Sequence, residues 1–122
     1  MKFAKRVFFV AGTYGVLVLI PQYFLEGRTG RDFPPPITHP EFYYGFIGVA
    51  LAWQFLFFII ARDPVRYRAA IGPAIFEKIS FVVAVVVLYT QGRIAGPMLL
   101  AAAIDFTFAI LFFFAYRATP KS

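Results

Sequence analysis

The chain contains no cysteine and a single histidine among its 122 residues. The absence of cysteine excludes disulfides, thiolate metal sites, iron–sulfur clusters and a cysteine nucleophile. A single histidine, His39, also excludes haem ligation by a pair of membrane histidines. Imidazole can bind metal or transfer protons, but no second ligand lies near His39 in the sequence. We interpret His39 as the end of a loop that precedes a helix, and we expect no cofactor.

Acidic residues are scarce as well, with six Asp and Glu against twelve Lys and Arg, a formal charge of +6. In a soluble protein this charge would suggest a nucleic-acid partner. Here the basic residues flank apolar runs, where they meet anionic lipid headgroups. No basic patch interleaved with aromatic residues lies outside those flanks, so we predict membrane lipids, and no nucleic acid, as partners.

Apolar residues are abundant: 61% of the chain is hydrophobic and 20% is aromatic. A bilayer core about 30 Å thick requires roughly 20 apolar residues as helix. Four such runs are present, Val7 to Leu25, Phe42 to Ala61, Ile71 to Thr90 and Ala95 to Tyr116. Pro73 and Pro97 are predicted in first helical turns, where proline is tolerated. We therefore predict an all-α fold, an integral membrane four-helix bundle that forms one domain over residues 1–122.

The basic residues around these runs are unevenly distributed. Eight of them precede the first run, connect the second to the third, or follow the fourth: Lys2, Lys5, Arg6, Arg62, Arg66, Arg68, Arg117 and Lys121. The opposite flanks carry Arg28, Arg31 and Arg93. Because Lys and Arg accumulate in short cytoplasmic loops, we predict that both termini are cytoplasmic. Residues 26–41 then form an external loop, in which Pro34, Pro35 and Pro36 and the early glycines favour turns and polyproline conformations over helix.

Asp105 is the most unusual residue within the predicted spans. At 1.5 Å per residue, it lies about 15 Å from either end of the fourth run, which is the midplane of the bilayer. An isolated carboxylate in hydrocarbon is expected to protonate or to find a partner. Helical spacing places Asp105 on one stripe with Ala101, Ala102, Ala109 and Phe112, and small residues on this stripe let another helix approach closely.

Glu77 and Lys78 lie side by side near the start of the third run. Glu77 shares a polar stripe with Ser80, whereas Lys78 is rotated about 100° away around the helix. We predict that Glu77 faces the bundle and that Lys78 extends its ammonium toward the cytoplasmic interface. Glu77 and Asp105 differ in depth by roughly 6 Å, which is within reach of side chains. Together with Gln54, near the middle of the second run, they define a predicted polar cluster of Asp105, Glu77, Gln54 and Ser80.

Three stretches carry a resemblance to known proteins: DFPPPITHPEFYYGFIGVALAWQ, ARDPVRYR and FEKIS. They resemble a group of small, uncharacterised bacterial membrane proteins with four predicted spans. In general layout the chain is also similar to DoxX-like proteins, although no DoxX functional motif matches residue by residue. The resemblance implies a bacterial origin and a four-helix layout in the inner membrane, and it identifies no catalytic residue.

The sequence leaves three functions open. The leading hypothesis is a binding or accessory bundle whose polar cluster holds a small amphiphile or fixes helix packing. The second is a membrane enzyme acting on a lipid or quinone, with Asp105 or Glu77 as general acid or base. The third is a proton-coupled transporter or channel, which four helices would form as an oligomer. Phenylalanine-rich faces around Phe57 and Phe113 could meet lipid, a second copy or a larger complex.

Overall fold

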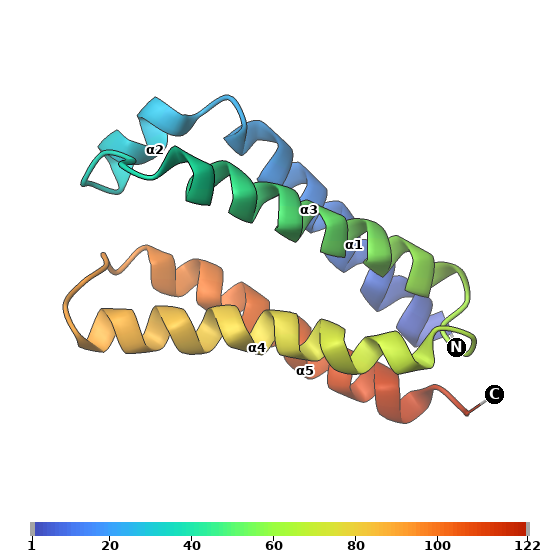
Figure 1. Ribbon diagram of the computed structural model, residues 1–122. Helices are drawn as coiled ribbons and strands as arrows, with labels where there is room; N and C mark the ends of the chain where they lie inside the picture. The colour runs from blue at the N-terminus through green and yellow to red at the C-terminus, as the bar shows by residue number, and fades with distance from the viewer. Residues whose placement is uncertain (1, 122) are drawn as a thin grey trace.

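A computed structural model describes residues 2–121 and contains five helices in this range (Figure 1). They are α1 (Lys2–Gln22), α2 (Glu26–Asp32), α3 (Pro40–Arg62), α4 (Arg68–Thr90) and α5 (Met98–Ala118). Each of the four long helices coincides with one predicted run and is long and apolar enough to cross a membrane. The prediction of an all-α bundle with four candidate spans is therefore confirmed.

Pro73 and Pro97 lie at different places relative to their helices. Pro97 immediately precedes α5, near its predicted place at the helix start. Pro73 lies inside α4, because this helix begins at Arg68, earlier than predicted. The prediction that Pro73 occupies a first turn is wrong, since the RDPVRYR connection is tighter than expected and Tyr67 N–H donates to the Asp63 carbonyl at 3.1 Å. Proline has no N–H, so the Ala69 carbonyl lacks its usual helical donor.

The connection between α1 and α3 is partly helical. The expectation that residues 26–41 avoid helix is wrong for Glu26–Asp32, which form α2. Contacts with α3 stabilise this short helix, because Tyr44 donates a hydrogen bond to the Glu26 carboxylate at 3.0 Å. Gly30 also lets α2 pack closely against Pro36, because a Cβ at Gly30 would lie 3.0 Å from the Cα of Pro36. Tertiary contacts have overridden the local preference of glycine for turns.

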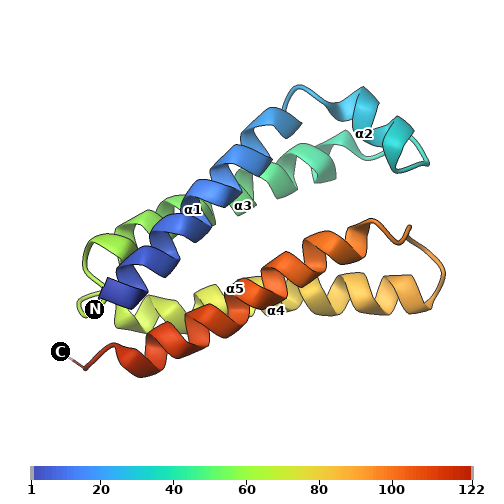
Figure 2. The same cartoon turned by 180° about the vertical axis from the view of Figure 1, so that it is seen from behind.

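The four long helices form two antiparallel hairpins, α1 with α3 and α4 with α5 (Figure 1). Seen from both sides, the hairpins meet at the end that holds the two termini and the α3–α4 connection, and they diverge toward the end that holds α2 (Figure 2). The eight basic residues predicted to share one side belong to the segments at the joined end.

Buried residues explain why the hairpins meet at one end only. The main core joins all four long helices near the termini: Ala4, Val7, Phe8, Ala11, Phe57, Ile60, Ile71, Ala74, Phe112 and Ala115. The rings of Phe8 and Phe112 stack with centroids 4.3 Å apart, and Phe57 packs edge-on to Phe112 at 5.1 Å. A second, smaller core of Leu19, Ile47 and Ala50 joins α1 to α3 alone. Between membrane helices such close packing supplies the attraction, because lipid tails are as apolar as the side chains.

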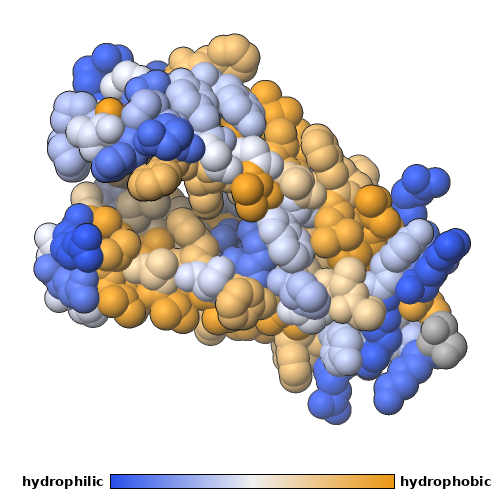
Figure 3. Space-filling view, viewed as in Figure 1, coloured by the Kyte–Doolittle hydropathy of each residue, from blue (hydrophilic) through white to orange (hydrophobic). Residues whose placement is uncertain are grey.

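The phenylalanine-rich faces divide between core and surface. Phe57 and Phe112 are fully buried, whereas Phe55, Phe113 and Phe114 are about half exposed, at 53%, 48% and 54%. A belt of apolar surface lies between hydrophilic ends (Figure 3). This distribution is typical of helices whose outer faces meet lipid.

Candidate functional site

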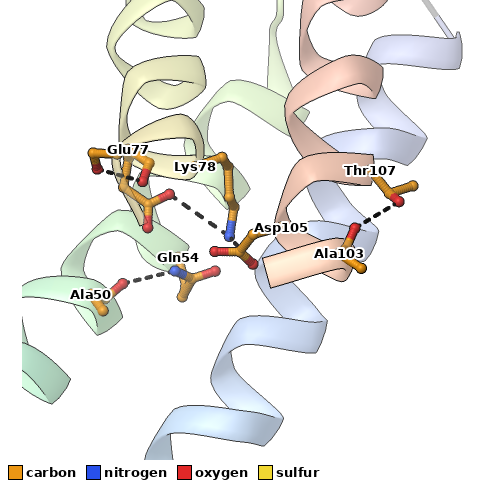
Figure 4. A network of polar contacts seen from close by, with 8 residues as sticks. Ala50, Gln54, Glu77, Lys78, Ala103, Asp105 and Thr107 are labelled. Atoms are coloured by element: carbon orange, nitrogen blue, oxygen red, sulfur yellow. Dashed lines mark hydrogen bonds and ion pairs between the residues drawn. The ribbon is translucent and has the colours of Figure 1, made fainter. Parts of the chain in front are cut away.

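A charged cluster lies where the two hairpins separate (Figure 4). The ammonium nitrogen of Lys78 lies 3.5 Å from Asp105 Oδ1 and 3.7 Å from Glu77 Oε2. Gln54 lies on α3 one helical turn before Phe57, whose ring contacts the same ammonium at 5.4 Å, so three helices meet at this point. We call Gln54, Glu77, Lys78 and Asp105 the polar cluster.

The prediction that Lys78 reaches toward the interface is wrong. Its side chain is only 4% exposed and points into the bundle. The physical reason is that Asp105 on the neighbouring helix needs a cationic partner, because an unpaired buried charge is far more costly than a paired one. Lys78 is the one basic residue of the chain that lies outside the flanks of the predicted spans. This position is the signal in the sequence from which its pairing with Asp105 could have been predicted.

Aromatic rings complete the surroundings of the Lys78 ammonium. Its nitrogen lies 5.4 Å from the ring centroid of Phe57 on α3 and 5.6 Å from that of Phe108 on α5. A cation within about 6 Å of an aromatic centroid is attracted to the face of the ring, by roughly 2 kcal/mol when water is excluded. Phe108 in turn packs against Tyr14 of α1 at 5.6 Å. Residues of all four long helices therefore surround or support the charge.

Gln54 is buried, with only 2% of its surface exposed. This burial agrees with its place in the predicted polar cluster. Its side-chain N–H donates to the Ala50 carbonyl at 2.8 Å, while its Oε1 has no hydrogen-bond partner among the described residues. Gly15 on α1 makes room for this amide, because a Cβ at Gly15 would overlap the Gln54 side chain. The contact between α1 and α3 at this level thus depends on glycine.

Glu77 lies beside Lys78, but one of its oxygens lacks a hydrogen bond. Oε2 is buried and has no partner at hydrogen-bond distance within residues 2–121. Its partner is the Lys78 ammonium at 3.7 Å, an ion pair that is too long for a hydrogen bond. An unsatisfied buried polar group costs about 1 to 3 kcal/mol. Gln54 Oε1, unpaired among the described residues, lies against Gly15, where a Cβ would overlap it, so this atom belongs to the contact between α1 and α3.

The structure confirms the predicted stripe on α5 but not the one on α4. On α5 the stripe is confirmed, since Ala102, Ala109 and Phe112 are buried on the same face as Asp105. On α4 the predicted stripe of Glu77 and Ser80 is not the inward one; the buried residues are Ile71, Ala74, Lys78 and Val85. Ser80 is exposed, and its hydroxyl donates to the backbone carbonyl of Glu77 at 3.0 Å. The structure therefore brings Asp105 and Glu77 to Lys78, places Gln54 one helical turn before Phe57, which contacts the same lysine, and leaves Ser80 outside.

His39 does not belong to the polar cluster and lies in the segment before α3. Its side chain is 68% exposed; the ring stacks on Phe42, and Nδ1 lies 3.5 Å from Glu41. Within residues 2–121, no three His, Asp or Glu side chains are grouped so that they could hold a metal ion. The position of His39 at the end of the loop agrees with its interpretation from the sequence.

A hollow opens between the diverging hairpins (Figure 3). Its walls are largely apolar, and hydrophilic surface is visible at its inner end (Figure 3). Consistent with this opening, the side chains of Glu77 and Asp105 remain 18% and 17% exposed. We call this hollow between the α1–α3 and α4–α5 hairpins the cleft. Lys78 contacts Phe57 of the four-helix core that closes the other end, so the polar cluster lies at the apex of the cleft.

Comparison with protein-family models, curated proteins and solved structures finds no match to this chain.

Proposed function

We propose that this chain is a multi-pass protein of the bacterial inner membrane that binds a small amphiphile in the cleft. Both termini face the cytoplasm in this proposal, because the eight basic residues of the joined end satisfy the positive-inside rule. The cleft then opens toward the external leaflet. One observation carries the proposal: two carboxylates that share one buried ammonium, and that both remain partly exposed, lie at the apex of an open, apolar cleft.

The chemistry of the polar cluster narrows the ligand. Two carboxylates share one ammonium, and both carboxylates remain partly exposed. Acceptors in excess of donors favour a ligand whose polar end carries a hydroxyl or an amine. The apolar walls favour a hydrocarbon chain. A long-chain alcohol or amine has both properties, whereas a fatty acid would place a third carboxylate next to Glu77 and Asp105.

Proton-coupled transport is the second candidate. It is supported by the ionisable groups themselves, since intramembrane carboxylates and lysines line many ion routes. The four-helix core around Phe8, Phe57 and Phe112 closes the other end of the cleft. Transport therefore requires a second conformation in which this core opens, while binding requires only the present one. The same carboxylates could serve as general acid or base in a membrane enzyme, but no observation favours that role over binding.

The sole tryptophan of the chain makes the binding proposal testable. Trp53 is half-buried beside Gln54, with its ring 6.4 Å from that of Phe57, so its fluorescence reports on the polar cluster. The full chain in lipid nanodiscs is titrated with dodecylamine, dodecanol or dodecanoate. We expect a saturable response to the amine and the alcohol, with dodecanoate at least about tenfold weaker, because hydrogen bonds to charged groups contribute roughly 1.5 to 3 kcal/mol.

Variants separate binding from partitioning into the bilayer. Glu77→Gln with Asp105→Asn should weaken the amine response about tenfold, while Glu26→Gln at the far end of the molecule should leave it unchanged. Circular dichroism verifies that each variant remains helical. The proposal is contradicted if all three probes give a non-saturable response of equal size. It is also contradicted if the two carboxylate substitutions leave the response to the amine unchanged.

A further inference from the structure

A groove separate from the cleft lies between α1 and α3 at the joined end of the bundle. It encloses about 520 Å³ and is lined by Lys5, Arg6, Phe9, Phe58, Ala61 and Arg62. None of these residues belongs to the polar cluster. The groove therefore requires an explanation of its own.

The floor of the groove is apolar. Phe9 and Phe58 pack at a centroid distance of 5.8 Å, and Phe9 remains 58% exposed. Gly12 lets Phe58 lie close to α1, because a Cβ at Gly12 would be 2.8 Å from a ring carbon of Phe58. A hydrocarbon chain can lie along these two rings and Ala61.

The rim of the groove is positively charged. It includes Lys5, Arg6 and Arg62, and no acidic residue lines the groove. Within residues 2–121, none of these three cations takes part in an ion pair. All three belong to the basic end of the apolar belt, the level at which lipid headgroups lie. Three available cations above an apolar floor match one negatively charged headgroup above one acyl chain.

We propose that this groove is a binding site for a single anionic phospholipid. The lipid phosphate lies among Lys5, Arg6 and Arg62, and one acyl chain lies along Phe9 and Phe58. The apolar floor selects a lipid over a soluble anion, since a free phosphate would leave the rings uncovered. Occupancy of this site bridges the start of α1 to the end of α3 and so holds the two helices together at the basic end.

Native mass spectrometry of the full chain in mild detergent tests this site. The protein is titrated with dioleoylphosphatidylglycerol or dioleoylphosphatidylcholine, which share their chains and differ in charge. We expect one phosphatidylglycerol to be retained at least about tenfold more strongly than phosphatidylcholine, since each basic residue near an anionic surface contributes roughly a fivefold factor. Equal retention of the two lipids overturns the proposal, and so does displacement of phosphatidylglycerol by millimolar inorganic phosphate.

Three variants distinguish a built site from general positive charge. Lys5→Gln, Arg6→Gln and Arg62→Gln together should abolish the preference. The matched control removes three cations of the same end that do not line the groove, Lys2→Gln, Arg117→Gln and Lys121→Gln, and should retain it. Ala61→Phe fills the groove without changing charge and should also abolish the preference. Equal losses in the control, or a full preference in Ala61→Phe, would show that diffuse charge attracts the lipid. The Trp53 response to dodecylamine should persist in all three variants, so this test stands apart from that of the cleft.

Discussion

The ammonium of Lys78 on α4 lies 3.5 Å from a carboxylate oxygen of Asp105 on α5, and both side chains are largely withdrawn from the surface. This pair links the two helices of one hairpin at the level where the other hairpin turns away. Phe57 of α3 lies against the same ammonium, so the charge also contacts the opposite hairpin. The apex of the cleft is thus formed by an interaction that depends on two charges being present together.

The first prediction concerns the coupling of this pair. Lys78→Met should lower the free energy of unfolding by about 2 to 4 kcal/mol, because it leaves two carboxylates without their cation. Asp105→Asn should cost less, since Glu77 remains beside Lys78. The double variant, Lys78→Met with Asp105→Asn, should be about 1 to 3 kcal/mol more stable than the sum of the two single losses predicts. The measurement is unfolding by dodecyl sulfate in mixed micelles, followed by circular dichroism.

The control for this cycle is Lys121→Met, which removes an exposed lysine and should change stability by less than about 0.5 kcal/mol. Strict additivity of the Lys78 and Asp105 substitutions would show that the two residues do not interact in the folded protein.

The second prediction compares two glycines within helices. Gly15→Ala should destabilise the protein by about 1 to 3 kcal/mol, because the new methyl group overlaps the Gln54 side chain. Gly45→Ala meets nothing within 4 Å and should be neutral or stabilise α3 by up to about 1 kcal/mol. The same unfolding measurement applies to both.

A rescue variant identifies the cause of the Gly15 effect. Combining Gly15→Ala with Gln54→Ala removes the overlap and should recover part of the lost stability. If Gly15→Ala behaves like Gly45→Ala, the close approach of α1 to Gln54 is absent in the membrane.

The third prediction concerns the attachment of α2. Tyr44 donates to Glu26 at 3.0 Å, and the Tyr43 hydroxyl lies at hydrogen-bond distance from that of Thr29, 3.4 Å. Tyr44→Phe and Tyr43→Phe should each accelerate amide hydrogen exchange across residues 26–32 by roughly twofold to tenfold, since each hydrogen bond contributes about 0.5 to 1.5 kcal/mol. Tyr89→Phe, at an exposed tyrosine on α4, serves as the control. Unchanged exchange in both variants would mean that other contacts hold α2.

The fourth prediction tests orientation in the membrane. A green fluorescent protein fused after residue 121 should fluoresce in bacterial cells, because it remains in the cytoplasm under the positive-inside rule. Alkaline phosphatase fused after Phe33 should be active, because the α2 segment is then external. The opposite pattern, an inactive phosphatase at Phe33 and a dark terminal fusion, would invert the proposed topology and turn the cleft toward the cytoplasm.

Much of the fold could be predicted because the bilayer imposes a length on each span. Runs of about 20 apolar residues must be helical to satisfy their backbone polar groups internally, so the number of long helices followed directly. The stripe around Asp105 could be predicted as well, since alanines there contrast in size with the phenylalanines on the other faces of α5. Helix α2 could not, because contacts with Tyr44 and Pro36 stabilise it and its own composition does not favour helix.

The sequence by itself determined the helical class, the four candidate spans and the presence of a charge in the middle of the last one, because backbone hydrogen bonding and hydropathy act locally along the chain. Only the tertiary structure decided which of two adjacent residues, Glu77 or Lys78, points inward. Helix α4 is apolar on nearly every face, so its rotation about its own axis depends on the neighbouring helices, and the partner that Asp105 requires decides it.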